Sequence, residues 1–305
     1  MAKVYPDGSS YAWTPEMGEE GIIIRMSKST AGSSYWCVQQ MWLQQTFPKE
    51  QGLVKHLVVG DDVHNGLDLF YQGLQDHNVE NIKRIIGNKG DATEYLMSLV
   101  PTPDMILKNR RAENKDFPFY HDDYSRNMKW LMEYENARIQ MDPQNVLPVA
   151  NEVRLEVRMD FNVNGHGLIP VQFVGIIDRI FRAPGGGLML FELKTGKWSD
   201  YKLPQMRGEM AYYQFLIENA PKDYLIEKGL DAPVTHWGWR YSAADTWNIE
   251  ETKIASHAAM KKRVHDLLVA YLTQNFPLAN QDFKCSYCNY IELCPKYAIQ
   301  TEEGA

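Results

Sequence analysis

The sequence has no long apolar run and no basic, apolar leader, and each absence excludes a class of protein. The longest apolar stretches are only as long as a β-strand, so none is predicted to span a membrane. The first residues lack the regions of a secretory signal peptide. We therefore expect a soluble, cytoplasmic protein with no membrane partner.

Basic residues are outnumbered by acidic ones, and the formal net charge is −7. A uniformly basic protein that coats nucleic acid is thereby excluded. Binding to DNA is not, because affinity for phosphates depends on local patches rather than on total charge. No Gly-x-x-x-x-Gly-Lys-Ser/Thr loop occurs, so the chain carries no ATPase motor of its own. Any helicase would be a separate partner protein.

The 305 residues, 44% of them hydrophobic, can build one large domain or two small ones. Residues 1–32 are rich in Gly, Ser and Pro, and we expect them to be irregular. Residues 33–145 are expected to be helical, because apolar side chains recur at helical spacing. The clearest helices are expected at 33–46, 60–75 and 122–141.

The hydrophobic pattern changes to a period of two within residues 146–275. Val153, Leu155 and Val157 alternate with charged residues, which predicts a half-buried strand. Two strands that would complete an antiparallel meander are expected at 171–181 and 188–194. A helix is expected from about residue 203. Two paired strands follow at 235–242 and 246–250, and a last long helix follows at 251–273. The pattern indicates an α/β domain with a helical N-terminal part.

Two predicted neighbouring strands carry charged residues. Asp178 lies in the second strand of the meander, and Glu192 and Lys194 lie in the third. Period-two geometry places Glu192 and Lys194 on one face, and hairpin pairing can bring Asp178 beside them. Two carboxylates can hold a divalent cation through oxygen ligands, with the Leu193 carbonyl as an extra ligand. Lys194 could then position a water molecule or stabilise charge on phosphorus.

The same spacing also has an ordinary explanation. An Asp followed by Glu-x-Lys occurs by chance roughly once in a chain of this length. Cross-strand charge pairs on a solvated sheet face are common. The charges here, however, interrupt apolar strands, which is costly unless the charged groups coordinate something. The strand context therefore favours a metal site.

The four cysteines are the second informative group. Cys285, Cys288 and Cys294 form a C-x2-C-x5-C cluster within residues 276–305, and Cys37 stands alone. Disulfides are rare in the cytoplasm, so clustered cysteines suggest metal binding. Four thiolates suit either zinc or an iron–sulfur cluster. A free, buried Cys37 unrelated to the other three is the remaining reading.

Taken in order, these residues resemble the RecB-like branch of the PD-(D/E)XK nuclease superfamily, with its Cas4-like and AddB/Dna2-type iron–sulfur nucleases. That family has a cysteine on an early helix, Gly-x-x-x-His, Gly-x-x-Asp-Arg, Glu-x-Lys, a Gln-x-x-x-Tyr helix and three terminal cysteines. The matching residues, within about 33–298, are Cys37, His64, Asp178, Glu192, Lys194, Tyr213, Cys285, Cys288 and Cys294. The chain departs at one place: Glu209 stands where Gln is usual, and Gln205 competes for that role.

The resemblance implies a restriction-endonuclease-like mixed sheet with helices on both sides and a C-terminal iron–sulfur clip, residues 276–305, packed with Cys37. It implies a [4Fe–4S] cluster on the four cysteines, with zinc as the alternative. It implies Mg²⁺ or Mn²⁺ on His64, Asp178, Glu192 and the Leu193 carbonyl, with Asp178, Glu192 and Lys194 as catalytic residues. Side chains expected to contact DNA are Arg179, Lys197, Gln205, Arg207, Glu209 and Tyr213.

The implied activity is that of a metal-dependent DNA nuclease, an exonuclease or end-processing enzyme acting on single strands or frayed ends. It would serve replication, recombination, repair or CRISPR spacer acquisition in a bacterial, archaeal or phage-infected cell, and it could be encoded by a phage. A helicase or a recombination or CRISPR protein would be its partner. The alternative is a catalytically inactive DNA-binding or assembly protein that keeps the nuclease fold.

Overall fold

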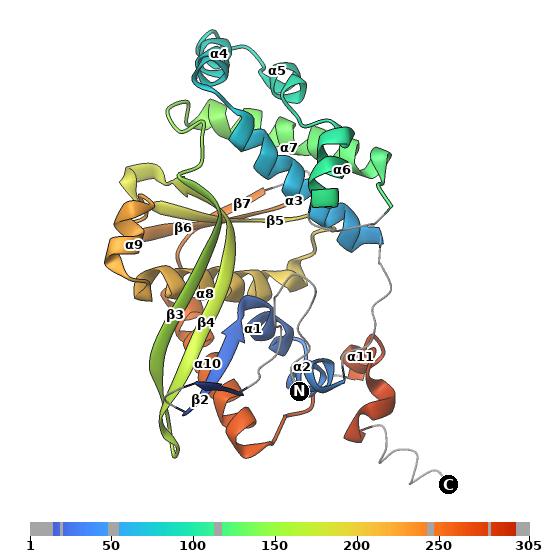
Figure 1. Cartoon of the computed structure of the whole chain (residues 1–305), viewed down its shortest axis with the longest axis vertical. Helices are drawn as coiled ribbons and strands as arrows, with labels where there is room; N and C mark the ends of the chain where they lie inside the picture. Colours follow the sequence, from blue (N-terminus) through green and yellow to red (C-terminus); the bar gives the residue numbers. More distant parts are fainter. Residues whose placement is uncertain are drawn as a thin grey trace.

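The computed structural model describes residues 15–18, 21–47, 55–112, 118–242, 247–279 and 282–296. They form a mixed seven-stranded sheet with helices on both faces (Figure 1). The predicted α/β class, with a central mixed sheet flanked by helices and a helical N-terminal part, is confirmed. Within these residues, every helix is too short or too polar to cross a membrane.

The predicted meander forms the middle of the sheet. Its strands are β3 (Ala150–Val163), β4 (Gly167–Arg182) and β5 (Leu188–Lys194), each antiparallel to the next. Alternate residues of β3 are buried and exposed, as the sequence predicts. The sheet continues with β6 (Val234–Tyr241), parallel to β5, and with β7 (Trp247–Glu251), antiparallel to β6.

The N-terminal segment corrects one prediction. Residues 1–32 were expected to be irregular, but β1 (Pro15–Gly18), β2 (Gly21–Ser27) and the start of α1 (Lys28–Ser34) lie within them. β2 pairs in parallel with β4, through Ile24–Ser27 and Val171–Val174. The predicted irregular residues 1–14 and 19–20 lie outside the described ones. The sheet therefore recruits a strand from far upstream.

One face of the sheet is covered by α1, α8 (Leu203–Asn219) and α10 (Ile254–Thr273). The short helix α9 (Lys222–Glu227), which the sequence does not predict, follows α8. Apolar residues of β2, β3, β4, β6, α8 and α10 form the larger core, and members buried completely include Met26, Phe173, Ile180, Met210, Leu216, Trp237 and Leu268. This core fixes α8 across the strands that carry the site.

The opposite face carries the helices of the predicted helical part (Figure 1). They are α3 (Lys55–Gly73), α4 (Asp76–Gly87), α5 (Thr93–Ser98), α6 (Pro103–Ala112) and α7 (His121–Met141). Their core includes Val63, Leu67, Ile82, Met128 and Leu193. Because Leu193 of β5 belongs to this core, its neighbours in the strand face the α8 side.

The C-terminal segment returns to α2 (Val38–Thr46), near the start of the chain (Figure 1). Trp42 of α2 stacks on Phe276, with ring centroids 5.0 Å apart. Trp36 meets Phe283 of α11 (Asp282–Cys285) edge to face at 6.1 Å. These contacts place the C-terminal segment beside α2 and the residues just before it.

Candidate active site

The site begins where β4 and β5 separate. Their ladder runs from Arg182–Leu188 to Arg179–Phe191 and stops before Asp178. Beyond that point the Leu193 amide donates its hydrogen bond, of 2.8 Å, to a side chain instead of to the β4 backbone. The acceptor is Asp178 Oδ2. A buried carboxylate is thereby fixed between two splayed strands.

Glu192 and Lys194 lie on the same side of β5, as the period-two spacing predicts. The Lys194 ammonium is 2.5 Å from Glu192 Oε1. Only 2% of the Glu192 side chain is exposed, and its Oε2 is buried without a hydrogen-bond partner among the described residues. A buried carboxylate oxygen with no donor is unfavourable unless something else approaches it.

His64 brings α3 to the same point. Its Nε2 is 3.2 Å from the Leu193 carbonyl oxygen. Its Nδ1 is 3.8 Å from Asp178 Oδ2 and 3.9 Å from Glu152 Oε1. One ligand atom from each of His64, Glu152 and Asp178 lies within 4.8 Å of the others, which makes these three a group that could hold a metal ion.

Glu152 is a member of this group that the sequence analysis missed. Simple alternation along β3 would turn its side chain away from the site, toward the exposed face of Arg154. Its backbone, however, has a φ of +46°. This left-handed conformation redirects the side chain toward His64 and Asp178. The only signal in the sequence was an acidic residue directly before an apolar strand.

Lys28 is the second residue that the sequence analysis missed. It follows β2 and begins α1, and its ammonium is 2.5 Å from Glu192 Oε1. The same ammonium is 3.6 Å from Glu209 Oε2 and 5.0 Å from the centroid of the Tyr213 ring. Nothing in the local sequence predicts this, because it depends on β2 pairing beside β4.

The helix α8 supplies both candidates for the usual Gln position. Gln205 Nε2 donates a hydrogen bond of 2.9 Å to Glu209 Oε1. Glu209 is buried, and its Oε2 is 3.2 Å from the Lys194 ammonium. Both residues line the cleft at the site, so the structure brings both to it. Tyr213 is fully buried on the same helix, and its hydroxyl has no hydrogen-bond partner in the described part of the chain.

Four expected DNA-contact residues stay away from the cleft. Arg179 is 1% exposed and Tyr213 is 0% exposed, so neither offers a surface to DNA in this structure. Arg207 is held by Glu250 of β7 through two hydrogen bonds of 2.8 and 2.6 Å. Lys197 is exposed, but it does not line the cleft. Both residues are buried in this structure, and their expected contact with a DNA backbone stays a prediction.

The cleft itself lies between α3, the ends of β4 and β5, and α8. It is an open depression of about 820 Å³, and its lining includes Lys28, His64, Glu152, Asp178, Lys194 and Lys202. Carboxylates and ammonium groups thus share one solvent-accessible space. A phosphate and a divalent cation could both be accommodated there.

Burial and mutual charge set the ionisation of these carboxylates. Burial and the neighbouring Glu192 raise the pKa of Asp178, against the opposing charges of His64 and Lys28. Burial would raise the pKa of Glu192 as well, but the Lys194 and Lys28 ammonium groups outweigh it and lower that pKa to about 2. Glu192 is therefore ionised at neutral pH.

The basic groups respond in the opposite direction. Burial lowers the pKa of Lys194, but the Glu192 carboxylate outweighs this and raises it above its usual range, so Lys194 remains an ammonium. Burial also lowers the pKa of His64, and the Asp178 and Glu152 carboxylates outweigh it, so the net shift is upward. In both basic groups the opposite charges outweigh the loss of solvation.

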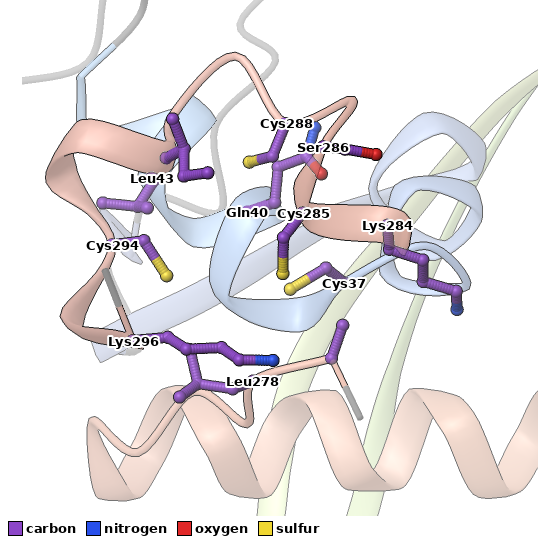
Figure 2. A pocket seen from close by; sticks show the side chains of 12 residues that line it. Cys37, Gln40, Leu43, Leu278, Lys284, Cys285, Ser286, Cys288, Cys294 and Lys296 are labelled. Carbon is purple, nitrogen blue, oxygen red and sulfur yellow. The ribbon is translucent and has the colours of Figure 1, made fainter. Parts of the chain in front are cut away.

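The four cysteines line one cavity of about 290 Å³. Cys37, between α1 and α2, faces the three C-terminal cysteines across it (Figure 2). All four are free and partly buried. No four sulfur atoms lie within 4.8 Å of one another, since the only such ligand group among the described residues is the one at His64.

Comparison with known proteins identifies the family. The model of the PD-(D/E)XK nuclease superfamily matches residues 35–295. Among solved structures, the crystal structure of SSO0001 is similar at 17% identity and a TM-score of 0.33, over 82% of this chain and 99% of that one. The crystal structure of Scheffersomyces stipitis Rai1 is similar at 10% identity and a TM-score of 0.22, over 58% and 52%. No curated protein sequence matches this chain.

Proposed function

Because the chain belongs to the PD-(D/E)XK nuclease superfamily, we propose that it is a metal-dependent DNA nuclease that trims single strands or frayed ends. The observation that carries the proposal is the convergence of Asp178, Glu192 and Lys194 beside His64 in one open cleft. The metal-ligand group and the ammonium that would face a phosphate come from separate elements. A bound cation beside a fixed positive charge would suit phosphodiester hydrolysis.

The donor set fits Mg²⁺ or Mn²⁺. Asp178 and Glu152 provide carboxylate oxygens, His64 provides a ring nitrogen, and the Leu193 carbonyl is beside it. Hard divalent cations prefer such oxygen ligands. The buried Glu192 Oε2, which has no hydrogen-bond partner among the described residues, is a further acceptor available to a cation. When bound, the ion would polarise the phosphodiester and make a water molecule more acidic.

The protein's own groups have separate tasks in this proposal. The Leu193 amide holds the Asp178 carboxylate in place, so one of its oxygens is fixed toward His64. Lys194 stays protonated, so it acts as a fixed positive charge beside the scissile phosphate and not as a base. Such a preplaced charge stabilises the negative charge that develops on the phosphate oxygens.

The four cysteines line one cavity, although their sulfur atoms form no compact group in this structure. Four thiolates at one place could hold either zinc or an iron–sulfur cluster. We propose that Cys37, Cys285, Cys288 and Cys294 hold a [4Fe–4S] cluster with a structural role. Zinc is the alternative.

Several biological processes need the proposed activity. An enzyme that shortens DNA ends serves replication, recombination, repair or CRISPR spacer acquisition, in a bacterial, archaeal or phage-infected cell. The chain lacks a nucleotide-binding loop. A separate helicase or recombination protein would then supply the unwound strand.

The deciding experiment is a cleavage assay on end-labelled single- and double-stranded DNA with Mg²⁺, with Mn²⁺ and with EDTA. We expect metal-dependent shortening, and its loss in Lys194→Ala. Lys262→Ala removes an exposed lysine of α10 that pairs with Asp266, and it serves as the matched control. DNA binding without cleavage in a sample that contains its cluster would instead support the inactive DNA-binding alternative.

A further inference from the structure

Four charged side chains form a closed network in the floor of the cleft. Lys28 and Lys194 are each 2.5 Å from Glu192 Oε1. They are also 3.6 Å and 3.2 Å from Glu209 Oε2. Each ammonium therefore touches both carboxylates, and the four formal charges sum to zero.

Burial makes this balance necessary. The side chains of Glu192 and Glu209 are 2% and 6% exposed, so water screens both carboxylates only weakly. A buried charge that loses its partner is strongly destabilising. Lys194 alone would face two carboxylates and could neutralise only one. Tyr213, beneath Lys28, contributes a ring face but no charge.

The two lysines also differ in origin and in access. Lys194 belongs to the strand that carries Glu192, and 31% of its side chain is exposed to the cleft. Lys28 arrives from β2 and α1 and is 20% exposed. Both lysines contact the same two carboxylates, and the more exposed one is better placed to meet a substrate.

We propose that Lys28 is a positioning residue of the active site: it shares with Lys194 the neutralisation of the buried carboxylates of Glu192 and Glu209, so that Lys194 is able to act on the substrate phosphate. The inference rests on the proposed nuclease function. It makes Lys28 and Glu209 a compensating pair. Removing either charge disturbs the site, and removing both restores the balance.

The test is a double-mutant cycle of Lys28→Met, Glu209→Gln and the combined variant, with Lys262→Met as the control for loss of a surface lysine. We expect each single variant to lower kcat for Mn²⁺-dependent cleavage about tenfold. The double variant should recover to within about threefold of the wild type. Lys28→Arg keeps the charge and should also retain activity.

Mn²⁺ affinity and thermal stability provide readouts that do not need catalysis. Lys28→Met adds a net negative charge and should tighten Mn²⁺ binding about tenfold, whereas Glu209→Gln should weaken it about tenfold. The double variant should bind Mn²⁺ like the wild type. Without metal, the double variant should have a higher Tm than Lys28→Met.

Additive effects on kcat and Tm would overturn the proposal, as would Mn²⁺ affinities that shift in the same direction in both single variants. If the wild-type protein cuts no DNA, only the proposed nuclease function is contradicted. The Tm and Mn²⁺-affinity measurements on the four proteins would still decide the role of Lys28. If Lys28→Met does not fold, the proposal requires that Glu209→Gln rescue its folding.

Discussion

At the scale of single residues, Glu152 combines a positive φ with a position beside His64 and Asp178. Residues other than glycine pay about 1–2 kcal/mol for this backbone conformation. Such strain is retained where it places a functional side chain. The positive φ at Glu152 therefore lowers the stability of the folded protein but places a third ligand in the proposed metal group.

Two substitutions at Glu152 distinguish the cost of its strained backbone from the contribution of its carboxylate to metal binding. In metal-free buffer, Glu152→Gly should be more stable than Glu152→Gln by roughly 0.5–1 kcal/mol, because glycine adopts positive φ without strain. With Mn²⁺, both should lose much of the rise in Tm that the wild type gains. Thermal unfolding with and without Mn²⁺ measures both effects. Equal stability of the two variants in metal-free buffer would show that the backbone is not strained.

Glu192 predicts how stability depends on pH. Burial opposes ionisation, but Lys194 and Lys28 hold the pKa of the folded protein at about 2, below the usual value of 4.5. A lowered pKa stabilises the fold above pH 4.5, and this stabilisation is lost as the pH falls from 4.5 toward 2. In EDTA, the Tm of Glu192→Gln should fall less steeply over that range than the wild-type Tm. Parallel curves would contradict the assignment.

The sequence predicted the residues whose position depends on local geometry. Glu192 and Lys194 share a face because strand side chains alternate, and this needs no knowledge of the rest of the chain. Lys28 and Glu152 were missed for physical reasons. Lys28 reaches the site only through the parallel pairing of β2 with β4. Glu152 reaches it only because its φ breaks the alternation of β3.

At the scale of elements, α8 packs closely against the residue that follows α1. The close contact is between Gly208 of α8 and Tyr35. A Cβ atom added to Gly208 would be 1.9 Å from Tyr35 Oη and 2.3 Å from its Cζ. A rigid aromatic ring cannot absorb such an overlap by changing its own shape. The close approach of Tyr35 therefore depends on Gly208.

Gly208→Ala should accordingly destabilise the protein by about 1–3 kcal/mol, the usual cost of overpacking. Gly73→Ala is the matched control, since a Cβ at Gly73, which ends α3, would meet nothing within 4 Å. It should be neutral or slightly stabilising. Chemical denaturation of both variants compares them directly. Equal stabilities would mean that Tyr35 moves aside at little cost.

Some helices and strands could be predicted from the sequence and others could not. The helix over α7 and the three strands of the meander show clear hydrophobic periods, so their order and pairing follow from the sequence. β2 has no alternation to reveal it, because apolar residues occupy the consecutive positions 22–24 of a strand of seven residues. Arg207 was expected at DNA because its charge is visible in the sequence, whereas its pairing with Glu250 depends on the position of β7.

At the scale of the whole molecule, the cysteine cavity joins the C-terminal segment to Cys37 and α2. If a cluster binds there, its free energy of binding becomes part of the free energy of folding. Cys37→Ser and Cys288→Ser, purified without oxygen, should lose most of their iron and lower the Tm by about 5–10 °C. Ser286→Ala, in the same cavity, is the matched control.

Elemental analysis and the absorbance spectrum decide between the metals. Zinc in stoichiometric amount, with no iron, would replace the proposed [4Fe–4S] cluster by a zinc site. Full iron content in Cys37→Ser would remove that residue from the ligand set. A similar loss of stability in Ser286→Ala would show that the cavity is sensitive to any substitution.

The same cavity has a consequence for synthesis of the protein. Cys37 leaves the ribosome long before Cys285, Cys288 and Cys294 exist. At roughly 5–20 residues per second, translation of the intervening chain takes on the order of tens of seconds. The cavity can be completed only after the nuclease core between its two halves has been made. A nascent chain that stalls before residue 285 therefore lacks three of the four thiols and cannot acquire the proposed cluster.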